Sequence, residues 1–341
     1  MTIKDVAQEA GVSVSTVSRV INSGDTSAAS PETQKKIWEA ARELGYVPNQ
    51  SARQLRKPKS QAPQNVQRID CIFARVIGTN VDYFFEQIMY EIQSELLKHG
   101  SQMSGIYTLQ NLGNSGMQHN CSNAAVVLGR LDEEQLLILK RHYSHIVTIS
   151  LQDRDLSVDQ VISRGYDAVV NSVKYLHSLG HKQICYLGET VHEQRYDAYL
   201  DIMETIGVSN PESLVVEAAF SPASGYNAVQ QLLERGKPFT AILCANDVLA
   251  LGVIKALNDH HLRVPRDVSI IGINDKEDVR YLDPMLTAVN IPIKEMGKHA
   301  TKLLLDRIAG GHQLPVKLLL PNKLNVRESC GPVGTGQSKQ R

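Results

Sequence analysis

The sequence lacks the features of disulfide-linked, zinc-binding and membrane-spanning proteins. Its five cysteines are far apart and form no C-x-x-C pair, which argues against a disulfide framework and a cysteine zinc site. The N-terminal segment has no apolar core of a signal peptide, and no apolar run has the length needed to span a bilayer. We therefore expect a cytoplasmic protein with reduced thiols and no membrane contact.

Motifs of several enzyme classes are missing too. No G-x-G-x-x-G follows a predicted strand, and neither a P-loop nor an H-E-x-x-H occurs. The 11 histidines are scattered, and we interpret His260-His261 as a solvated pair at a helix end rather than a metal site. The sequence therefore predicts no catalytic site, no metal and no cofactor.

The chain has no net charge, with 36 basic and 36 acidic residues, so its overall charge does not indicate a partner. Charge is uneven locally, because basic residues exceed acidic ones within residues 1–59. The excess lies at the end of this segment, where Arg53, Arg56, Lys57 and Lys59 have no acidic neighbour. Such a patch is suited to phosphate groups.

Two short helices joined by a glycine turn are predicted at the N-terminus. The first begins at Thr2 and ends at Gly11, because glycine adopts the left-handed conformation without steric cost. Ser13 can cap a second helix over residues 14–22. This helix has the right length to lie in a major groove, as in a helix-turn-helix.

A third helix is predicted to support these two. It begins at Ser30-Pro31-Glu32, which supplies a cap, a first-turn proline and a first-turn acid, and it ends at Gly45. These capping signals alone leave open any other small three-helix bundle.

From Arg68 onward, short apolar runs alternate with amphipathic helical stretches, a pattern typical of parallel βαβ units. The predicted strands are residues 69–76, 124–129, 145–150, 183–188, 241–246 and 268–274, and the predicted helices are 84–99, 168–179, 247–261 and 293–309. This series indicates an α/β fold with two doubly wound lobes.

Long stretches of sequence resemble the LacI/GalR family of bacterial repressors. The strings IKDVAQEAGVSVSTVSRVIN and ARELGYVPNQSARQLR resemble the family's DNA-binding head, nearly without gaps over residues 2–56. The similarity continues in LGH, ANDVLALGV, RVPRDVSIIGIND and PMLTAVNIP. It implies an all-α helix-turn-helix head followed by a two-lobed, doubly wound effector domain like the type I periplasmic binding proteins.

The resemblance implies four segments. They are a helix-turn-helix DNA-binding domain (residues 1–47), a hinge helix and linker (48–67), a two-lobed ligand-binding and dimerisation domain (68–330) and a disordered tail (331–341). The tail contains no leucine heptads, so we expect a homodimer rather than a tetramer.

The same resemblance implies which residues contact double-stranded DNA. Val14 and Ser15 open the recognition helix, and Arg19 holds the place of a base-reading arginine, whose guanidinium suits guanine. Polar groups suited to phosphates, or to the turn into the hinge, are those of Thr2, Ser13, Thr16, Ser18, Asn22, Thr33, Tyr46 and Asn49.

The hinge is expected to act in the minor groove. Residues 49–55 form at most one short helix, which is unstable alone and needs pairing in a dimer on DNA. The resemblance places Ala52 and Leu55 against the minor groove, with Leu55 wedged between base pairs. A plain solvated linker is the alternative, and the basic tract after residue 55 is longer than is usual in the family.

The resemblance also implies an effector site between the lobes, where open α/β sheets bind ligands. Its predicted contacts are Tyr83, Phe84, Phe85, Arg195, Phe220, Asn246, Asn274 and Asp275. The phenylalanines can equally belong to the core, Arg195 to a surface ion pair, and the asparagines to turns at strand ends. The sequence departs from the family pattern at two positions, because Asn274 and Ser150 stand where sugar-responsive members carry acidic residues. The neighbouring Asp153 is the suggested substitute for an acid at position 150.

These features together predict a sequence-specific transcriptional repressor that binds a palindromic operator and is released by a small-molecule inducer. The segments INDKEDVRYLDP and LPNKLNVRES are most similar to repressors of galactose or β-galactoside operons, which makes a sugar the expected effector. Two alternatives stay open. One is a regulator that needs a corepressor, as in the family's purine branch, and the other is a sugar-binding transport or chemosensory protein.

Overall fold

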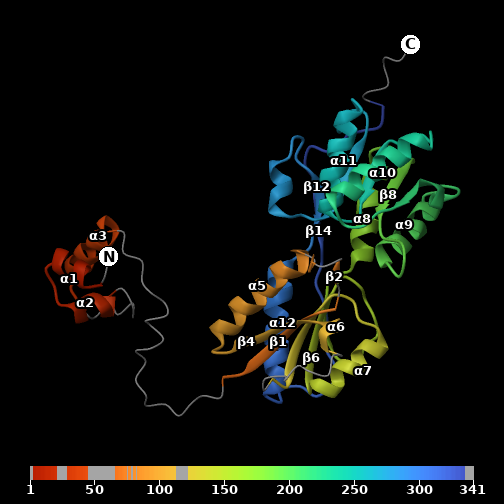
Figure 1. Ribbon diagram of the computed structural model, residues 1–341. Coiled ribbons are helices and arrows are strands. Elements are labelled where there is room, and N and C mark those ends of the chain that lie inside the picture. Colours follow the sequence, from red (N-terminus) through yellow and green to blue (C-terminus); the bar gives the residue numbers. More distant parts are fainter. Residues whose placement is uncertain are drawn as a thin grey trace. The chain divides into compact units, whose positions relative to one another are not determined.

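The chain divides into two units, residues 1–65 and 66–341, in a computed structural model that describes residues 3–20, 29–44, 66–74, 76–77, 80–81, 83–112 and 122–334 (Figure 1). The first unit contains α1 (Ile3–Glu9), α2 (Val14–Ser18) and α3 (Pro31–Glu43). Their apolar faces meet in a small core that includes the buried side chains of Val6, Val17 and Ile37. A three-helix unit of this kind is what the capping signals predict.

The turn between α1 and α2 has the predicted chemistry. Gly11 has a φ of +63°, and the Ser13 Oγ accepts a hydrogen bond from the backbone N–H of Thr16 at 3.1 Å. The regular helix ends at Ser18, four residues before its predicted end. Arg19 keeps helical torsions, and its N–H donates to the carbonyls of Ser15 and Thr16, so helical backbone continues in a wider turn over residues 19–20.

The second unit is built on two six-stranded sheets. The N lobe has the strand order β13-β7-β6-β5-β1-β4, and the C lobe has the order β14-β12-β11-β10-β8-β9. Neighbouring strands are parallel, except that β14 pairs antiparallel with β12. The strands of the N lobe are β1 (Arg68–Phe73), β4 (Gln102–Thr108), β5 (Ala124–Leu128), β6 (His145–Ser150), β7 (Asp159–Ile162) and β13 (Lys317–Leu319). Those of the C lobe are β8 (Ile184–Gly188), β9 (Val215–Glu217), β10 (Ala241–Cys244), β11 (Ser269–Asn274), β12 (Thr287–Asn290) and β14 (Lys323–Asn325).

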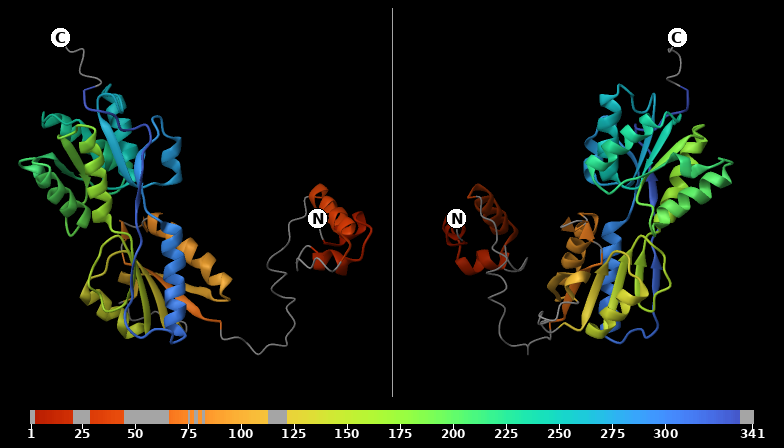
Figure 2. Two further views of the ribbon diagram at one scale, coloured as in Figure 1. Left: turned by 180° about the vertical axis from the view of Figure 1, so that it is seen from behind. Right: turned by 45° about the vertical axis from the view of Figure 1, so that its right-hand side comes forward.

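Helices cover both sheets, as the doubly wound prediction requires (Figures 1 and 2). The N lobe carries α5 (Tyr83–Lys98), α6 (Leu109–Leu112), α7 (Glu133–His142) and α12 (Ile293–Ile308), with the short strands β2 (Val76–Ile77) and β3 (Asn80–Val81). The C lobe carries α8 (Gly165–Ser178), α9 (Gln194–Thr205), α10 (Pro222–Glu234), α11 (Asp247–Asp259) and the 3-10 turns η2 (Pro211–Leu214) and η3 (Glu277–Tyr281). The α/β fold class with an all-α N-terminal unit is thus confirmed.

The chain passes between the lobes after β7, after β12 and after β13. As a result α12 follows a C-lobe strand but packs in the N lobe beside α5 (Figure 2). Gly297 permits this approach, because a Cβ there would lie 2.8 Å from the Cβ of Glu91. These crossings bring the carboxyl ends of the strands of both sheets toward the space between the lobes.

The end of the chain differs from the predicted disordered tail. His181 Nε2 lies 2.9 Å from the carbonyl oxygen of Gly331, and the N–H of Val333 donates to the carbonyl of Leu179. Backbone up to Val333 is therefore held against the C lobe, and residues 335–341 lie outside the described ones. Within the described part of the chain, no helix is both long and apolar enough to cross a membrane.

Candidate functional site

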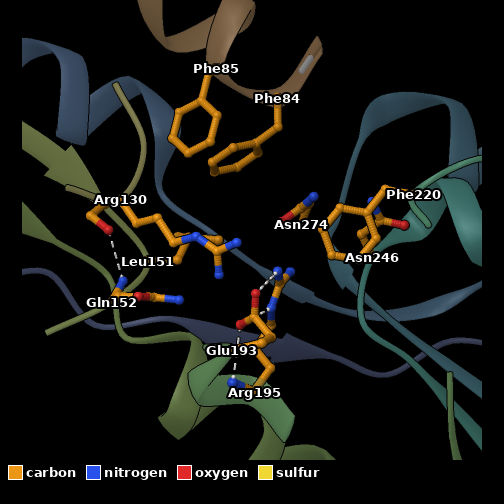
Figure 3. Close-up of a pocket in the computed structure, with 11 residues that line it drawn as sticks. Phe84, Phe85, Arg130, Leu151, Gln152, Glu193, Arg195, Phe220, Asn246 and Asn274 are labelled. Atoms are coloured by element: carbon orange, nitrogen blue, oxygen red, sulfur yellow. Dashed lines mark hydrogen bonds and ion pairs between the residues drawn. The ribbon is translucent and has the colours of Figure 1, made fainter. Parts of the chain in front are cut away.

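A cavity lies between the lobes (Figure 3). We call it the interlobe cavity, and it is lined by Phe84, Phe85, Arg130, Ser150, Leu151, Gln152, Glu193, Arg195, Phe220, Asn246 and Asn274. The two phenylalanines come from the start of α5, and most of the other side chains stand at or just after the carboxyl ends of strands.

The structure brings six of the eight predicted effector contacts to this cavity, namely Phe84, Phe85, Arg195, Phe220, Asn246 and Asn274. The side chain of Tyr83 lies outside the described residues. Asp275 does not line the interlobe cavity. That the six side chains bind an effector stays a prediction.

Asp275 faces partners in the protein instead. Its carboxylate is fully buried and accepts hydrogen bonds from Asn325 Nδ2 at 2.7 Å and from Arg327 at 2.5 Å. Arg280 lies 3.7 Å from it as well. This carboxylate therefore ties the end of β11 to the C-terminal segment around β14.

Arg195 forms a buried ion pair with Glu193 at the start of α9. Its Nε and one terminal nitrogen each lie 2.9 Å from a different carboxylate oxygen of Glu193, and its other terminal nitrogen donates to the carbonyl of Ala245 at 2.7 Å. Burial disfavours the charged guanidinium, but the charge and hydrogen bonds of Glu193 outweigh it and raise the pKa of Arg195. The guanidinium thus stays charged and is fixed in one orientation.

Phe220 packs against the guanidinium of this ion pair. The guanidinium carbon of Arg195 lies 4.9 Å from the centre of the Phe220 ring, a distance suited to a cation–π contact. Phe84 and Phe85 meet edge to face, with their ring centres 5.1 Å apart. Both are buried, so they belong to the core and line the cavity at the same time.

The two asparagines have different local roles. The Oδ1 of Asn246 caps α11 by accepting a hydrogen bond from Leu249 N at 2.9 Å. Asn274 ends β11 with a φ of +118°, which L-residues rarely adopt. Its Oδ1 is buried, and the described residues provide it with no hydrogen-bond partner. An unpaired buried oxygen at a cavity wall is suited to a ligand donor.

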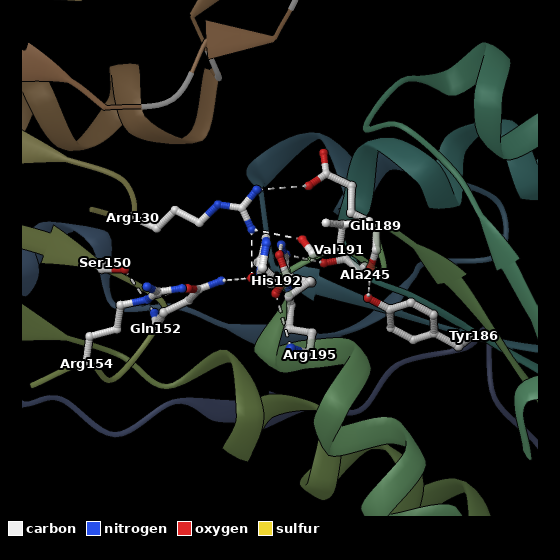
Figure 4. A network of polar contacts seen from close by, with 11 residues as sticks. Arg130, Ser150, Gln152, Arg154, Tyr186, Glu189, Val191, His192, Arg195 and Ala245 are labelled. Atoms are coloured by element: carbon white, nitrogen blue, oxygen red, sulfur yellow. Dashed lines mark hydrogen bonds and ion pairs between the residues drawn. The ribbon is translucent and has the colours of Figure 1, made fainter. Parts of the chain in front are cut away.

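Sequence reasoning missed Arg130, Gln152 and Glu193 as cavity residues. Arg130 donates to the carbonyl of His192 at 2.8 Å, and Gln152 Nε2 donates to the same carbonyl at 2.9 Å (Figure 4). Because Arg130 and Gln152 follow N-lobe strands and His192 follows a C-lobe strand, these bonds join the lobes. Their positions directly after β5 and β6 are the signal that points to them in the sequence.

Asp153 was the suggested substitute for an acid at position 150. Its carboxylate lies 2.6 Å from Arg164 and 2.9 Å from Lys317, outside the set of residues that line the cavity. Burial raises its pKa and these two cations lower it, with a net lowering. Ser150 therefore remains a neutral residue of the cavity wall with no acid in its place.

The predicted DNA contacts that the structure describes lie on and near α2. Ser13, Val14, Ser15 and Arg19 are exposed, and Thr16 is half-buried. Thr33 lies in α3 with its Oγ1 2.9 Å from the Oγ of Ser30. Thr2, Asn22, Tyr46, Asn49, Ala52 and Leu55, and the side chain of Ser18, lie outside the described residues.

An exposed, largely polar face on a short helix after a glycine turn is suited to a DNA groove.

No cluster of three or more histidine, cysteine or acidic side chains within the described ranges is placed to hold a metal ion.

Comparisons with known proteins identify related chains for both units. Residues 2–49 match the family described as "Bacterial regulatory proteins, lacI family", and residues 173–330 match the "Periplasmic binding protein-like domain". The "HTH-type transcriptional repressor PurR" of Escherichia coli O139:H28 is 30% identical over 344 residues, which cover 96% of each chain.

Two solved structures have similar folds over nearly the whole chain. One is a complex of the transcriptional regulator CelR with cellobiose, with a TM-score of 0.68 and 26% identity over 96% of this chain and 99% of that one. The other is the lac repressor dimer bound to operator and the anti-inducer ONPF, with a TM-score of 0.68 and 25% identity over 96% of this chain and 98% of that one.

Proposed function

The chain belongs to the LacI family of bacterial regulatory proteins and is a DNA-binding transcriptional regulator, and from this premise we propose that it represses a sugar-utilisation operon and is released by a sugar inducer. The interlobe cavity carries the proposal. An aromatic wall suits the apolar face of a sugar ring, and strand-end amides can bind neighbouring hydroxyls. Similarity to the cellobiose complex of CelR supports the same ligand class.

Binding to a palindromic operator requires two copies of the head, so we propose a homodimer. A ligand that binds one arrangement of the lobes more tightly shifts the population between DNA-competent and DNA-incompetent states. The bonds from Arg130 and Gln152 to the His192 carbonyl are suited to such a shift, because they exist only where the lobes are close.

A purine corepressor is the second candidate, favoured by the PurR relatives. The amide groups of Gln152, Asn246 and Asn274 can each donate and accept, which suits the edge of a purine as well as a diol. Titration of operator affinity with galactosides and with purines separates the two. A galactoside that weakens operator binding supports the sugar inducer, whereas a purine that strengthens it supports the corepressor.

We expect Arg19→Ala to weaken binding to the cognate operator by about 10- to 100-fold, because a guanidinium–guanine pair contributes ~1–3 kcal/mol of discrimination. Binding to random DNA should change far less. Fluorescence anisotropy with both duplexes measures the two affinities. Lys35→Ala, which removes an exposed positive charge from α3, is the matched control. An Arg19→Ala protein with unchanged sequence preference would show that this side chain reads no base.

A further inference from the structure

Among the described residues, Glu193 is the only one with a carboxylate that lines the interlobe cavity. Its negative charge is balanced within the protein by Arg195. One oxygen of Glu193 accepts from the backbone and Nε of Arg195, and the other accepts from a terminal nitrogen of Arg195. The Glu193 side chain is 4% exposed. This pair therefore adds no net charge to the cavity and leaves no carboxylate oxygen for a ligand hydroxyl.

Neutral acceptors of the wall are largely engaged too. The Oγ of Ser150 accepts from Gln152 N at 3.0 Å, and the Oε1 of Gln152 accepts from Arg154 Nε at 3.3 Å. Asn246 uses its Oδ1 to cap α11. Of the side-chain amide oxygens, that of Asn274 is the one with no donor among the described residues.

Arg130 supplies a charge that this wall does not neutralise closely. Its hydrogen bonds go to the uncharged carbonyls of Val191 and His192, and the carboxylate of Glu189 lies 3.9 Å away, beyond hydrogen-bond distance. Figure 3 shows its guanidinium between the two phenylalanines and the Arg195–Glu193 pair. Its side chain is 31% exposed, against 6% for Arg195, so it can still be reached by a ligand.

Apart from the loose ion pair with Glu189, no acid among the described residues of the cavity wall balances this charge. Ser150 and Asn274 are neutral, and the carboxylates of Asp153 and Asp275 are held by cations of their own. The lining residues themselves carry Arg130, Arg195 and Glu193 as their charged members, a net charge of one positive unit, with Glu189 beside the cavity as the only acid paired with Arg130 among the described residues.

We propose that the effector carries an anionic group, a carboxylate or a phosphate ester, which binds Arg130 while its ring lies against the phenylalanines. The inference rests on the proposed function and specifies its ligand class. Charge-assisted hydrogen bonds between guanidinium and carboxylate or phosphate are about twice as strong as neutral ones. A ligand oxygen at hydrogen-bond distance from Arg130 competes well with the more distant and partly exposed Glu189.

Calorimetry with the full chain tests the proposal by comparing ligands that share a chemical scaffold but differ in charge. The probes are galactose, galacturonate and galactose 6-phosphate, and guanosine with its monophosphate. For whichever scaffold binds, galactose or guanosine, we expect the anionic compound to bind at least ~10-fold more tightly than the neutral one. This difference in affinity should shrink as salt is added. The two galactose derivatives distinguish carboxylate from phosphate.

Arg130→Gln is expected to weaken binding of the anion by about 10- to 100-fold and binding of the neutral compound by less than ~3-fold. Glutamine keeps a donor for the His192 carbonyl, so the contact between lobes can persist. Arg235→Gln is the matched control, because Arg235 is also exposed and also donates to a backbone carbonyl, that of Val215 at 2.7 Å, away from the cavity.

Equal affinity for the neutral and anionic members of a scaffold overturns the inference, and so does an equal loss of both in Arg130→Gln. Tight binding of the nucleotide alone keeps the inference and refutes the sugar inducer. Tight binding of galactose alone refutes the anion and keeps the sugar. Binding by none of the five compounds refutes both statements.

Discussion

Glu193→Ala is expected to lower the free energy of unfolding by about 3–5 kcal/mol, the usual cost of leaving a buried charge without its partner. Arg195 is almost completely buried, and in the variant its guanidinium keeps only the carbonyl of Ala245 and the face of Phe220. Chemical denaturation followed by circular dichroism measures the effect. The variant also loses a cap of α9, since Glu193 accepts from the backbone N–H of Arg195.

Glu189→Ala is the matched control for this experiment. Glu189 lies in the same loop but is 25% exposed, and it is 3.9 Å from Arg130. We expect a change within ~1 kcal/mol, as for other exposed ion pairs. Combining Glu193→Ala with Arg195→Ala should cost less than the sum of the two single changes, because the double variant leaves no buried charge unpaired. A loss below ~1 kcal/mol for Glu193→Ala alone would contradict the assigned role of this pair.

Much of the fold was predictable because its buried strands are continuous apolar runs. Each of the six predicted runs overlaps a strand, and β6 has the predicted bounds. The strands that were missed are short or have weaker apolar patterns. Strands β7, β9 and β12 have only three or four residues and mix polar with apolar side chains. Strand β4 lies at a sheet edge and alternates between exposed and half-buried residues, and β13 and β14 are short and partly exposed. Their pairing depends on distant parts of the chain, which a local pattern does not contain.

The candidate site was predictable where a residue type is tied to a strand end. Asn246 and Asn274 follow apolar runs, so parallel topology alone places them at the edge of the sheet. The position of Arg130 after β5 could be recognised in this way, but its contact with the other lobe could not, and Glu193 lies in the loop after β8 rather than at a strand end. Nothing in the sequence near Arg130 indicates that it meets the His192 carbonyl from the other lobe, 62 positions along the chain. The sequence also could not show that Asn274 lines the cavity while the adjacent Asp275 does not. The two residues share one strand end but face different surroundings.

Asp247 is expected to make the protein less stable as the pH rises from about 4 to about 7. Burial raises the pKa of its carboxyl from 3.8 to about 7 in the folded state, against the lowering effect of the Lys276 N–H, which donates to Oδ2 at 2.8 Å. Its Oδ1 is buried with no hydrogen-bond partner among the described residues. Gly272 leaves space for that oxygen, because a Cβ there would lie only 2.5 Å from it.

The sign of this pH dependence follows from whether the folded or the unfolded state holds the proton more tightly. Below pH ~4 the carboxyl is protonated in both the folded and unfolded states, so it contributes no difference. Between the unfolded and folded pKa values the unfolded state releases its proton first, which favours unfolding. Above pH ~7 both states are ionised and the cost is constant, at about 4 kcal/mol for a difference of roughly three pKa units. Asp247 therefore opposes folding at neutral pH, which is the reverse of an ion-paired acid.

Asp247→Asn removes the titration while keeping an oxygen for the Lys276 N–H. We expect the variant to match the parent near pH 4 and to exceed its free energy of unfolding by up to about 4 kcal/mol near pH 8. Denaturation across this pH range measures the difference. Asp267→Asn is the matched control, because Arg263 lowers the pKa of Asp267, so its replacement should lose stability as the pH rises above its pKa. Parallel pH profiles for the parent and Asp247→Asn would mean that this carboxyl is hydrated and ionises normally in the folded chain, despite its enclosure between Gly272 and the start of α11.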